Sequence, residues 1–151
     1  MDMFEEKYEK FLSDVGESRI MVLSTSENDV VSSRMMSVVR IGDRFFFQTD
    51  ILLRKYRQIK ANPHMALCAD NIQIEGICEE MGHPLDNDGF REAFGKHFKG
   101  SYDAYTGLHN ERLFVISPVY VQRWVYDHGV PYIESFDVAG KNYSFRKYES
   151  Q

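Results

Sequence analysis

The first residues of the chain place their apolar side chains at helical spacing. The apolar positions are Phe4, Tyr8, Phe11, Leu12 and Val15. Because residues three or four apart share one face of a helix, this spacing predicts an amphipathic helix over residues 3–15. Gly16 follows directly and is typical of a helix C-terminus.

Short runs in which hydrophobic and small polar residues alternate then continue along the chain, and this period is typical of strands. The predicted strands span residues 19–26, 30–40, 44–49, 65–69, 72–81, 112–117 and 119–127. Gly42-Asp43 predicts a tight hairpin turn, and Pro118 is expected to separate the last two strands. Turns at His128-Gly129 and Ala139-Gly140 predict a hairpin-like region at the C-terminal end.

Two further helices are predicted between the strands. The first spans residues 52–61 and is ended by Asn62-Pro63, since proline cannot continue a helix. The second is expected to be capped by Asp86 and to run to about Phe98. A polar, glycine-containing segment at residues 99–110 follows it.

Many short antiparallel strands with a few helices predict a mainly β fold, a small β-barrel with peripheral α-helices. Exposed strand edges in a chain rich in Val, Ile, Phe and Tyr would promote aggregation. Closure of the sheet into a barrel would remove those edges. With no repeat and no linker, residues 1–151 are expected to form a single domain.

Charge and composition narrow the class of protein. A net charge of −5 argues against a partner that is a nucleic acid, and no apolar run approaches the length of a membrane span. The charged residues 1–16 do not resemble a signal peptide, so a cytoplasmic location is expected. Cys68 and Cys78 are interpreted as reduced thiols, and the five histidines show no spacing typical of metal ligands, so no metal site is predicted.

Positive charge is concentrated at two places in this acidic chain. Arg34 lies on a predicted strand between apolar neighbours, and Arg54 and Lys55 lie at the start of a predicted helix, where backbone N–H groups also gather. This combination is a candidate cradle for a phosphate-bearing ligand. The alternative is that Arg34 packs its stem while its head is hydrated, and that the helix presents a solvated basic face that includes Arg57.

An ordered set of motifs between Arg34 and Gly76 carries a resemblance to a known family. The motifs are RMMSVV, QT, RK five and six residues after Thr49, IKANPHMALC and IQIEG. Over roughly residues 4–127 the chain resembles the pyridoxamine 5'-phosphate oxidase-like family of flavin-binding proteins. The resemblance implies a six-stranded Greek-key split barrel, a homodimer, and FMN bound at the dimer interface.

The resemblance also implies which residues bind the cofactor. Arg34 would hold the FMN phosphate, with Arg54 and Lys55 as a second phosphate-binding pair. The methionine-bearing strand would lie along the isoalloxazine ring, and Trp124 would stack near it from the partner subunit or else serve as a core residue. The complete set of implied cofactor-binding residues is Arg34, Met35, Met36, Ser37, Gln48, Thr49, Arg54, Lys55, Asn71 and Trp124.

Two departures from the family pattern affect the expected activity. Val39 stands where the vitamin-synthesising oxidase has a substrate-contacting lysine, and that enzyme's basic C-terminal segment has no counterpart in this chain. Oxidation of pyridoxine phosphate itself is therefore not expected. Glu75, on the predicted strand IQIEG, is a candidate titrating group near the cleft, but it is interpreted as a half-exposed strand carboxylate without a catalytic role. Residues 82–110 are a candidate cover for the cleft.

The expected function is that of an FMN-dependent oxidoreductase. It would transfer hydride or electrons from a reduced nicotinamide or small reductant to a small organic acceptor or oxygen, with no catalytic side chain identified. Two alternatives remain open, a non-enzymatic flavin-binding carrier, sensor or store, and a haem-handling relative on the same barrel.

Overall fold

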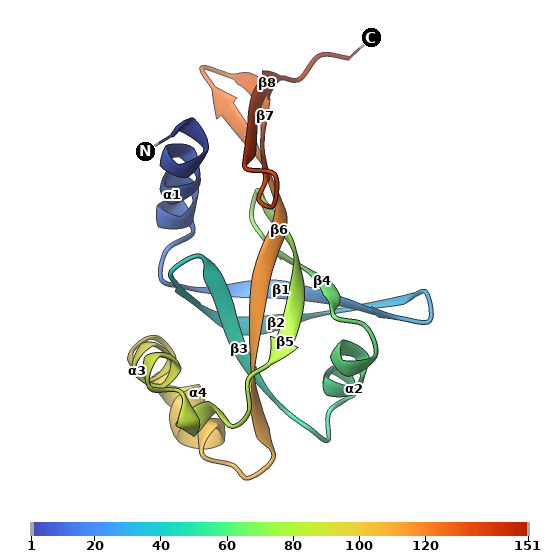
Figure 1. The fold of residues 1–151 in the computed structure, drawn as a ribbon, viewed down its shortest axis with the longest axis vertical. Helices are drawn as coiled ribbons and strands as arrows, with labels where there is room; N and C mark the ends of the chain where they lie inside the picture. Colours follow the sequence, from blue (N-terminus) through green and yellow to red (C-terminus); the bar gives the residue numbers. More distant parts are fainter. Residues whose placement is uncertain (1, 151) are drawn as a thin grey trace.

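A computed structural model describes residues 2–150, and its central feature is a closed barrel of six antiparallel strands (Figure 1). Strand β3 pairs with both β2 and β6, and the β3–β6 pairing closes the sheet on itself. The six strands are β1 Ser18–Glu27, β2 Val30–Ile41, β3 Arg44–Asp50, β4 His64–Ala69, β5 Ile72–Glu80 and β6 Glu111–Asp127. The predicted mainly β barrel is confirmed.

The order of strands around the barrel is that of a Greek key. Strands β1, β2 and β3 follow one another through short turns, and β4 then returns to pair with β1. The connection from β3 to β4 contains helix α2 (Arg54–Ala61), which lies beside the barrel. This order confirms the predicted topology.

Strand β6 is longer than the sequence predicted, because Pro118 does not end it. Glu111–Asp127 forms one continuous strand of 17 residues, and the prediction of two separate strands is wrong. Gly76 lies opposite Pro118 at an irregularity in the register between Glu75 and Gly76. A bulge of this kind accommodates a residue that lacks an N–H donor.

The C-terminal end of β6 extends beyond the barrel and carries a hairpin. This hairpin consists of β7 (Val130–Asp137) and β8 (Asn142–Lys147), as the sequence predicted, and it stands at the upper end of the molecule in Figure 1. Helix α1 (Met3–Val15) lies beside this extension and begins and ends as predicted.

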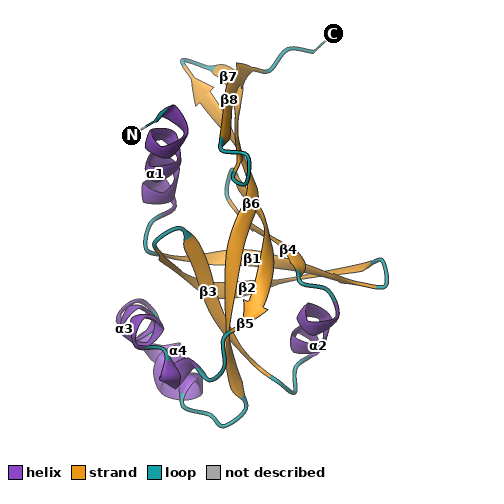
Figure 2. Cartoon of the chain, in the orientation of Figure 1, coloured by secondary structure: helices purple, strands orange, loops and turns teal. Residues whose placement is uncertain are grey.

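The segment between β5 and β6 is helical, and Figure 2 shows its helices grouped on one side of the lower part of the barrel. Its elements are the 3-10 turn η1 Pro84–Asp86, α3 Asp88–His97, α4 Lys99–Ser101 and the π-helical turn η2 Tyr102–Thr106. Asn87 rather than Asp86 caps α3, since its side chain accepts a hydrogen bond from the Phe90 N–H at 2.9 Å. Helix α2 begins two residues later than predicted, at Arg54.

Two groups of buried side chains stabilise this arrangement. The larger one fills the barrel and continues beneath α1. The smaller one lies outside the barrel wall beneath α3, where Phe90 and Phe94 pack with stacked rings 4.9 Å apart against β2, β3 and β6. Across residues 2–150, the structure contains no helix that is both long enough and apolar enough to span a membrane.

Candidate functional site

A cavity of about 430 Å³ lies where strands β2 and β3, the start of α2 and the helical segment meet. Both strands contribute consecutive residues to it, and six of the ten residues that the sequence nominated for cofactor binding line its wall. The lining residues are Met35, Met36, Ser37, Gln48, Thr49, Asp50, Leu53, Lys55, Phe94, Ser101, Tyr105 and Glu111.

Arg34 is half-buried beside this cavity and is fixed by neutral acceptors only. Its Nη1 donates to the Leu23 carbonyl oxygen at 3.2 Å and to Thr25 Oγ1 at 2.8 Å. Its Nη2 donates to Gln58 Oε1 at 2.7 Å. Since no carboxylate of residues 2–150 forms an ion pair with Arg34, its positive charge is oriented but not neutralised.

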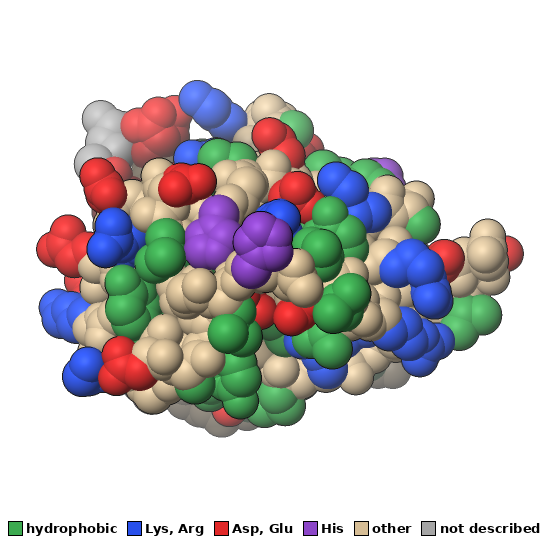
Figure 3. Space-filling model, turned by 90° about the horizontal axis from the view of Figure 1, so that it is seen from below, with side chains coloured by type: hydrophobic (Ala, Val, Ile, Leu, Met, Phe, Trp, Pro, Cys, Tyr) green, Lys and Arg blue, Asp and Glu red, His purple; other side chains and the backbone are tan. Residues whose placement is uncertain are grey.

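Lys55 and Arg54 bring two more cations to the same place. Burial lowers the pKa of Lys55, and the positive charge of Arg34 lowers it further, so the two side chains act on each other. Burial likewise lowers the pKa of Arg34, and the positive charge of Arg54 lowers it further. Figure 3 shows the molecule from below, with several Lys and Arg side chains on the right of the view beside hydrophobic and acidic ones. The positive charges of Arg54 and Arg34, and those of Arg34 and Lys55, therefore act on each other electrostatically.

Arg57, the third basic residue in the first part of α2, is placed differently. Its guanidinium is exposed and lies 3.4 Å from Glu27 Oε2. The structure thus separates a solvated, paired arginine from the unpaired cations Arg34, Arg54 and Lys55, a distinction that the sequence left open.

A buried side-chain hydroxyl and the uncapped start of helix α2 also suit a phosphate ester with polar substituents. Thr49 is 3% exposed, and its Oγ1 has no hydrogen-bond partner among the described residues. Helix α2 begins at Arg54 without a side-chain cap, so its first N–H groups are available to an anion. Because buried polar groups are rarely left unsatisfied, the Thr49 hydroxyl is an unusual feature of this wall.

The helical segment supplies the remaining side of the cavity. Thr106, in the π-helical turn, donates from Oγ1 to Gln48 Oε1 at 2.9 Å and so fixes this turn to β3. Phe94, Ser101 and Tyr105 from the same segment line the cavity. The carboxamide of Gln48 therefore also positions the wall, in addition to any contact with a ligand.

Sequence reasoning missed two residues of this site. Gln58 is 1% exposed and bonds to Arg34, Thr25 and Ser32 at once. Glu111 lies in the cavity wall and is 5% exposed. Burial raises the pKa of its carboxyl to about 6, and the nearby negative charge of Asp50 contributes to this increase. Neither residue belongs to a recognisable motif, so only the assembled barrel reveals them.

Two of the nominated residues lie away from this cavity. Asn71 lies in the β4–β5 turn and donates from Nδ2 to the Trp124 carbonyl oxygen at 2.5 Å. The Trp124 ring is 38% exposed and packs at 5.2 Å from the ring of Tyr148. Asn71 and Trp124 are thus brought together, but neither lines the cavity that holds six of the ten nominated residues.

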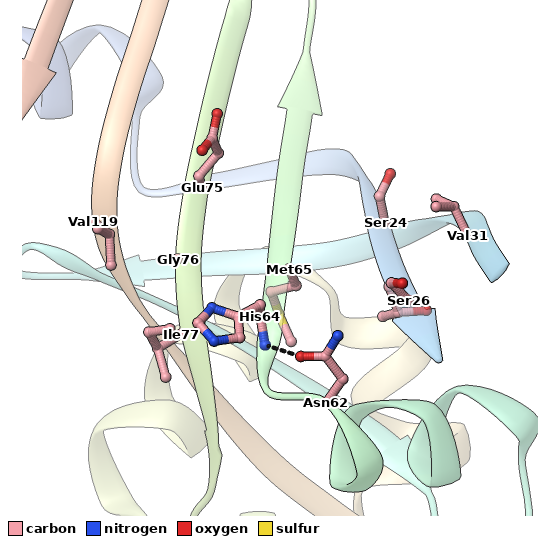
Figure 4. Close-up of a pocket in the computed structure, with 11 residues that line it drawn as sticks. Ser24, Ser26, Val31, Asn62, His64, Met65, Glu75, Gly76, Ile77 and Val119 are labelled. Carbon is pink, nitrogen blue, oxygen red and sulfur yellow. Dashed lines mark hydrogen bonds between the residues drawn. The ribbon is translucent and has the colours of Figure 1, made fainter. Parts of the chain in front are cut away.

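A second cavity of about 380 Å³ opens on the outer face of β1, β4 and β5 (Figure 4). Glu75, His64 and Ile77 line it, and the His64 backbone N–H donates to Asn62 Oδ1 at 3.0 Å. No Lys or Arg lines this cavity, and it contains none of the nominated residues. Within residues 2–150, no cluster of three or more His, Cys, Asp or Glu side chains is arranged to hold a metal ion.

The closed six-stranded architecture defines a class, namely split-barrel proteins. The chain belongs to the pyridoxamine 5'-phosphate oxidase family, since residues 4–125 match the family model described as "Pyridoxamine 5'-phosphate oxidase". No curated protein matches the chain.

Solved structures share the fold at low sequence identity. General Stress Protein 26 from Bacillus anthracis str. Sterne is 21% identical, with 95% of this chain and 99% of that chain covered and a TM-score of 0.60. A pyridoxamine 5'-phosphate oxidase-related, FMN binding protein from Nostoc punctiforme PCC 73102 is 13% identical, with 99% and 98% covered and a TM-score of 0.62. HutZ, the heme storage protein from Vibrio cholerae, is 15% identical, with 76% and 89% covered and a TM-score of 0.59.

Proposed function

We propose that the cavity between β2, β3 and α2 binds FMN and that the protein is an FMN-dependent oxidoreductase. The proposal is supported by the mutual electrostatic influence of Arg34, Arg54 and Lys55, none of which forms an ion pair among the described residues. Lys55 lines the cavity together with Thr49, whose buried hydroxyl has no hydrogen-bond partner among those residues. A doubly charged phosphate binds best to several charge-assisted donors at once. The Nostoc relative named as FMN binding has the same fold.

In this proposal each part of the chain has a distinct task. Arg34 and Lys55 hold the phosphate, and Gln58 keeps the Arg34 guanidinium oriented. Met35 and Met36 supply an apolar wall for the ring, while Ser37, Gln48 and Thr49 supply polar contacts. Phe94 and Tyr105, on the helical segment, limit the access of water.

When bound, FMN would supply the redox chemistry, taking a hydride from a reduced nicotinamide or another small reductant and passing electrons to a small organic acceptor or oxygen. The chain's own contribution is to bind and orient the cofactor. We further propose that the protein is a homodimer in which Asn71 and Trp124 reach the cofactor of the partner subunit. Their position outside the cavity of their own subunit is consistent with that role.

The binding proposal is tested by titrating purified protein with FMN and following flavin fluorescence. Arg34→Ala and Lys55→Ala are expected to weaken binding at least tenfold while the far-UV circular dichroism stays unchanged. Arg57→Ala is the matched control, since this arginine is exposed and paired with Glu27. Unchanged affinity in both Arg34→Ala and Lys55→Ala would contradict the proposal.

Two further measurements separate the alternatives. Anaerobic mixing of the FMN-loaded protein with reduced nicotinamide, followed by addition of an acceptor, distinguishes turnover from simple flavin storage. The structural likeness to a heme storage protein favours haem handling as the second candidate, and a Soret band in freshly purified protein would support it. Sedimentation or light scattering measures whether the chain is a dimer.

A further inference from the structure

Glu111 is the least expected residue in the cavity wall. It is the first residue of β6 and pairs across the sheet with Asp50, the last residue of β3. Glu111 is 5% exposed, and it lines the same cavity as Lys55. Two carboxylates, those of Glu111 and Asp50, therefore lie with one cation, Lys55, in the wall of a cavity proposed to bind an anion.

The Glu111 carboxylate has no protein partner of its own. Among residues 2–150 no side chain or backbone N–H donates a hydrogen bond to the Glu111 carboxylate, and Lys55 donates instead to Met36 Sδ at 3.5 Å. The charged and titratable groups that face it are Asp50 from β3, Lys55 from α2 and His83 from the segment after β5. Of these, Asp50 opposes its ionisation, and Lys55 and His83 favour it.

An ionised Glu111 is incompatible with an anion held by Lys55. Two carboxylates and a phosphate would then share one poorly hydrated cavity, and each like-charge pair at close range is unfavourable. A protonated carboxyl removes this repulsion and also gains an O–H donor. Burial already raises the pKa of Glu111 to about 6, so adding the proton near neutral pH costs little.

We propose that Glu111 takes up a proton when the cavity binds an anionic ligand, so that its carboxyl donates a hydrogen bond to the ligand instead of repelling it. This inference rests on the proposed function for the identity of the ligand, since FMN is the anion expected there. It assigns Glu111 as a ligand-contacting residue that selects anionic or acceptor-bearing ligands.

The proposal has a thermodynamic consequence with a definite sign. If the ligand raises the pKa of Glu111, binding takes up protons between the pKa of the free protein and that of the complex. Affinity must then fall as pH rises across that window, by at most about tenfold per pH unit for one proton. The phosphate of FMN, with a second pKa near about 6, works in the opposite direction, because the dianion binds best.

Calorimetric titration with FMN at pH 7, in buffers of different ionisation enthalpy, measures the number of protons taken up. The wild-type protein is expected to take up about half a proton or more per FMN. Glu111→Gln keeps a neutral, hydrogen-bonding side chain, so it should take up none, and it should bind FMN about tenfold more tightly at pH 8. Subtracting the proton uptake of Glu111→Gln from that of the wild type removes the contribution of the FMN phosphate, which is common to both.

Glu75→Gln is the matched control, because Glu75 is exposed and lines the other cavity (Figure 4). It should take up protons as the wild type does. No uptake in the wild type, or equal uptake in Glu111→Gln, would overturn the proposal even if FMN binds well.

Failure of FMN to bind would contradict the proposed function instead, and the same titration with inorganic phosphate then tests Glu111. Phosphate binding with proton uptake that Glu111→Gln abolishes would support the inference. Absence of binding by both probes would overturn it.

Discussion

Gln58 Oε1 accepts a hydrogen bond from Arg34 Nη2 at 2.7 Å and from Thr25 Oγ1 at 3.0 Å. The Gln58 Nε2 donates to Ser32 Oγ at 3.0 Å. One buried amide on α2 thus connects that helix to strands β1 and β2 and fixes the direction of the arginine. Because the amide is neutral, it orients the guanidinium without cancelling its charge.

Replacing Gln58 tests whether this charge serves a ligand. Gln58→Glu retains an acceptor for Arg34 but supplies a counter-charge, so FMN affinity should fall at least tenfold, as measured by fluorescence titration. Gln58→Leu leaves three polar groups without their partner and should lower the free energy of unfolding by about 1–3 kcal/mol. A Gln58→Glu protein that binds FMN as tightly as the wild type would show that Arg34 is not a phosphate ligand.

The ionisation of Glu111 should make the free energy of unfolding of the ligand-free protein depend on pH. Burial raises the pKa of Glu111 from its ordinary value of 4.5 to about 6 in the folded protein, so the folded state favours the protonated form. The contribution of Glu111 is therefore most favourable below pH 4.5 and is lost as pH rises through about 6. Glu111→Gln should raise the free energy of unfolding by about 1–2 kcal/mol at pH 7.5, as measured in urea, and by much less at pH 4.5. A Glu111→Gln protein that is less stable at pH 7.5 would contradict this assignment.

Helix α1 is attached to the C-terminal extension by a partly buried ion-pair network in which Glu134 is the buried member. Arg123 Nε lies 2.6 Å from Glu134 Oε1, Arg123 Nη2 lies 3.0 Å from Asp14 Oδ2, and the Tyr143 hydroxyl donates to Glu134 Oε2 at 2.7 Å. Arg123→Met leaves Glu134 buried without its cation and should lower the free energy of unfolding by about 3–5 kcal/mol. Lys99→Ala, which breaks an exposed pair with Asp103, should cost less than about 1 kcal/mol. Equal effects of the two substitutions in urea unfolding would argue against a structural role for the network.

The bulge opposite Pro118 should not tolerate a side chain at Gly76. A Cβ there would lie 2.7 Å from the Ser117 carbonyl oxygen and 2.8 Å from Ile116 Cγ2. Gly76→Ala should therefore lower the free energy of unfolding by about 1–3 kcal/mol, measured in urea. At Gly100 a Cβ meets nothing within 4 Å, so Gly100→Ala is the control and should leave stability unchanged or slightly raised. A stable Gly76→Ala protein would mean that the two strands separate easily at this point.

Local patterns predicted the elements whose neighbours lie close in the sequence. Residues 3–15 form α1 as expected because their apolar spacing selects one helix face, and Gly42 adopts the positive φ of 64° that its hairpin turn requires. Pro118 misled the prediction, since its effect depends on what lies across the sheet. Gly76 provides the bulge there, and the strand continues.

Only part of the candidate site was predicted, because local motifs do not show which distant residues the fold brings together. A resemblance in motif order nominated Met35, Gln48 and Lys55, and the structure gathers them in one cavity. Asn71 and Trp124, nominated in the same way, lie together outside it, and their proposed contact with the cofactor of a partner subunit stays a prediction.

By itself the sequence determined the mainly β class, the first helix, the hairpins and the placement of unusual positive charge on one strand and one helix start. These properties follow from residue periodicity and charge, which act over a few positions. The tertiary structure decided which cations remain unpaired, that Gln58 orients one of them, and that Glu111 and Thr49 are buried in the same wall. Burial and electrostatic environment arise only when residues distant in the chain are brought together, because desolvation and pairing are properties of the assembled surroundings.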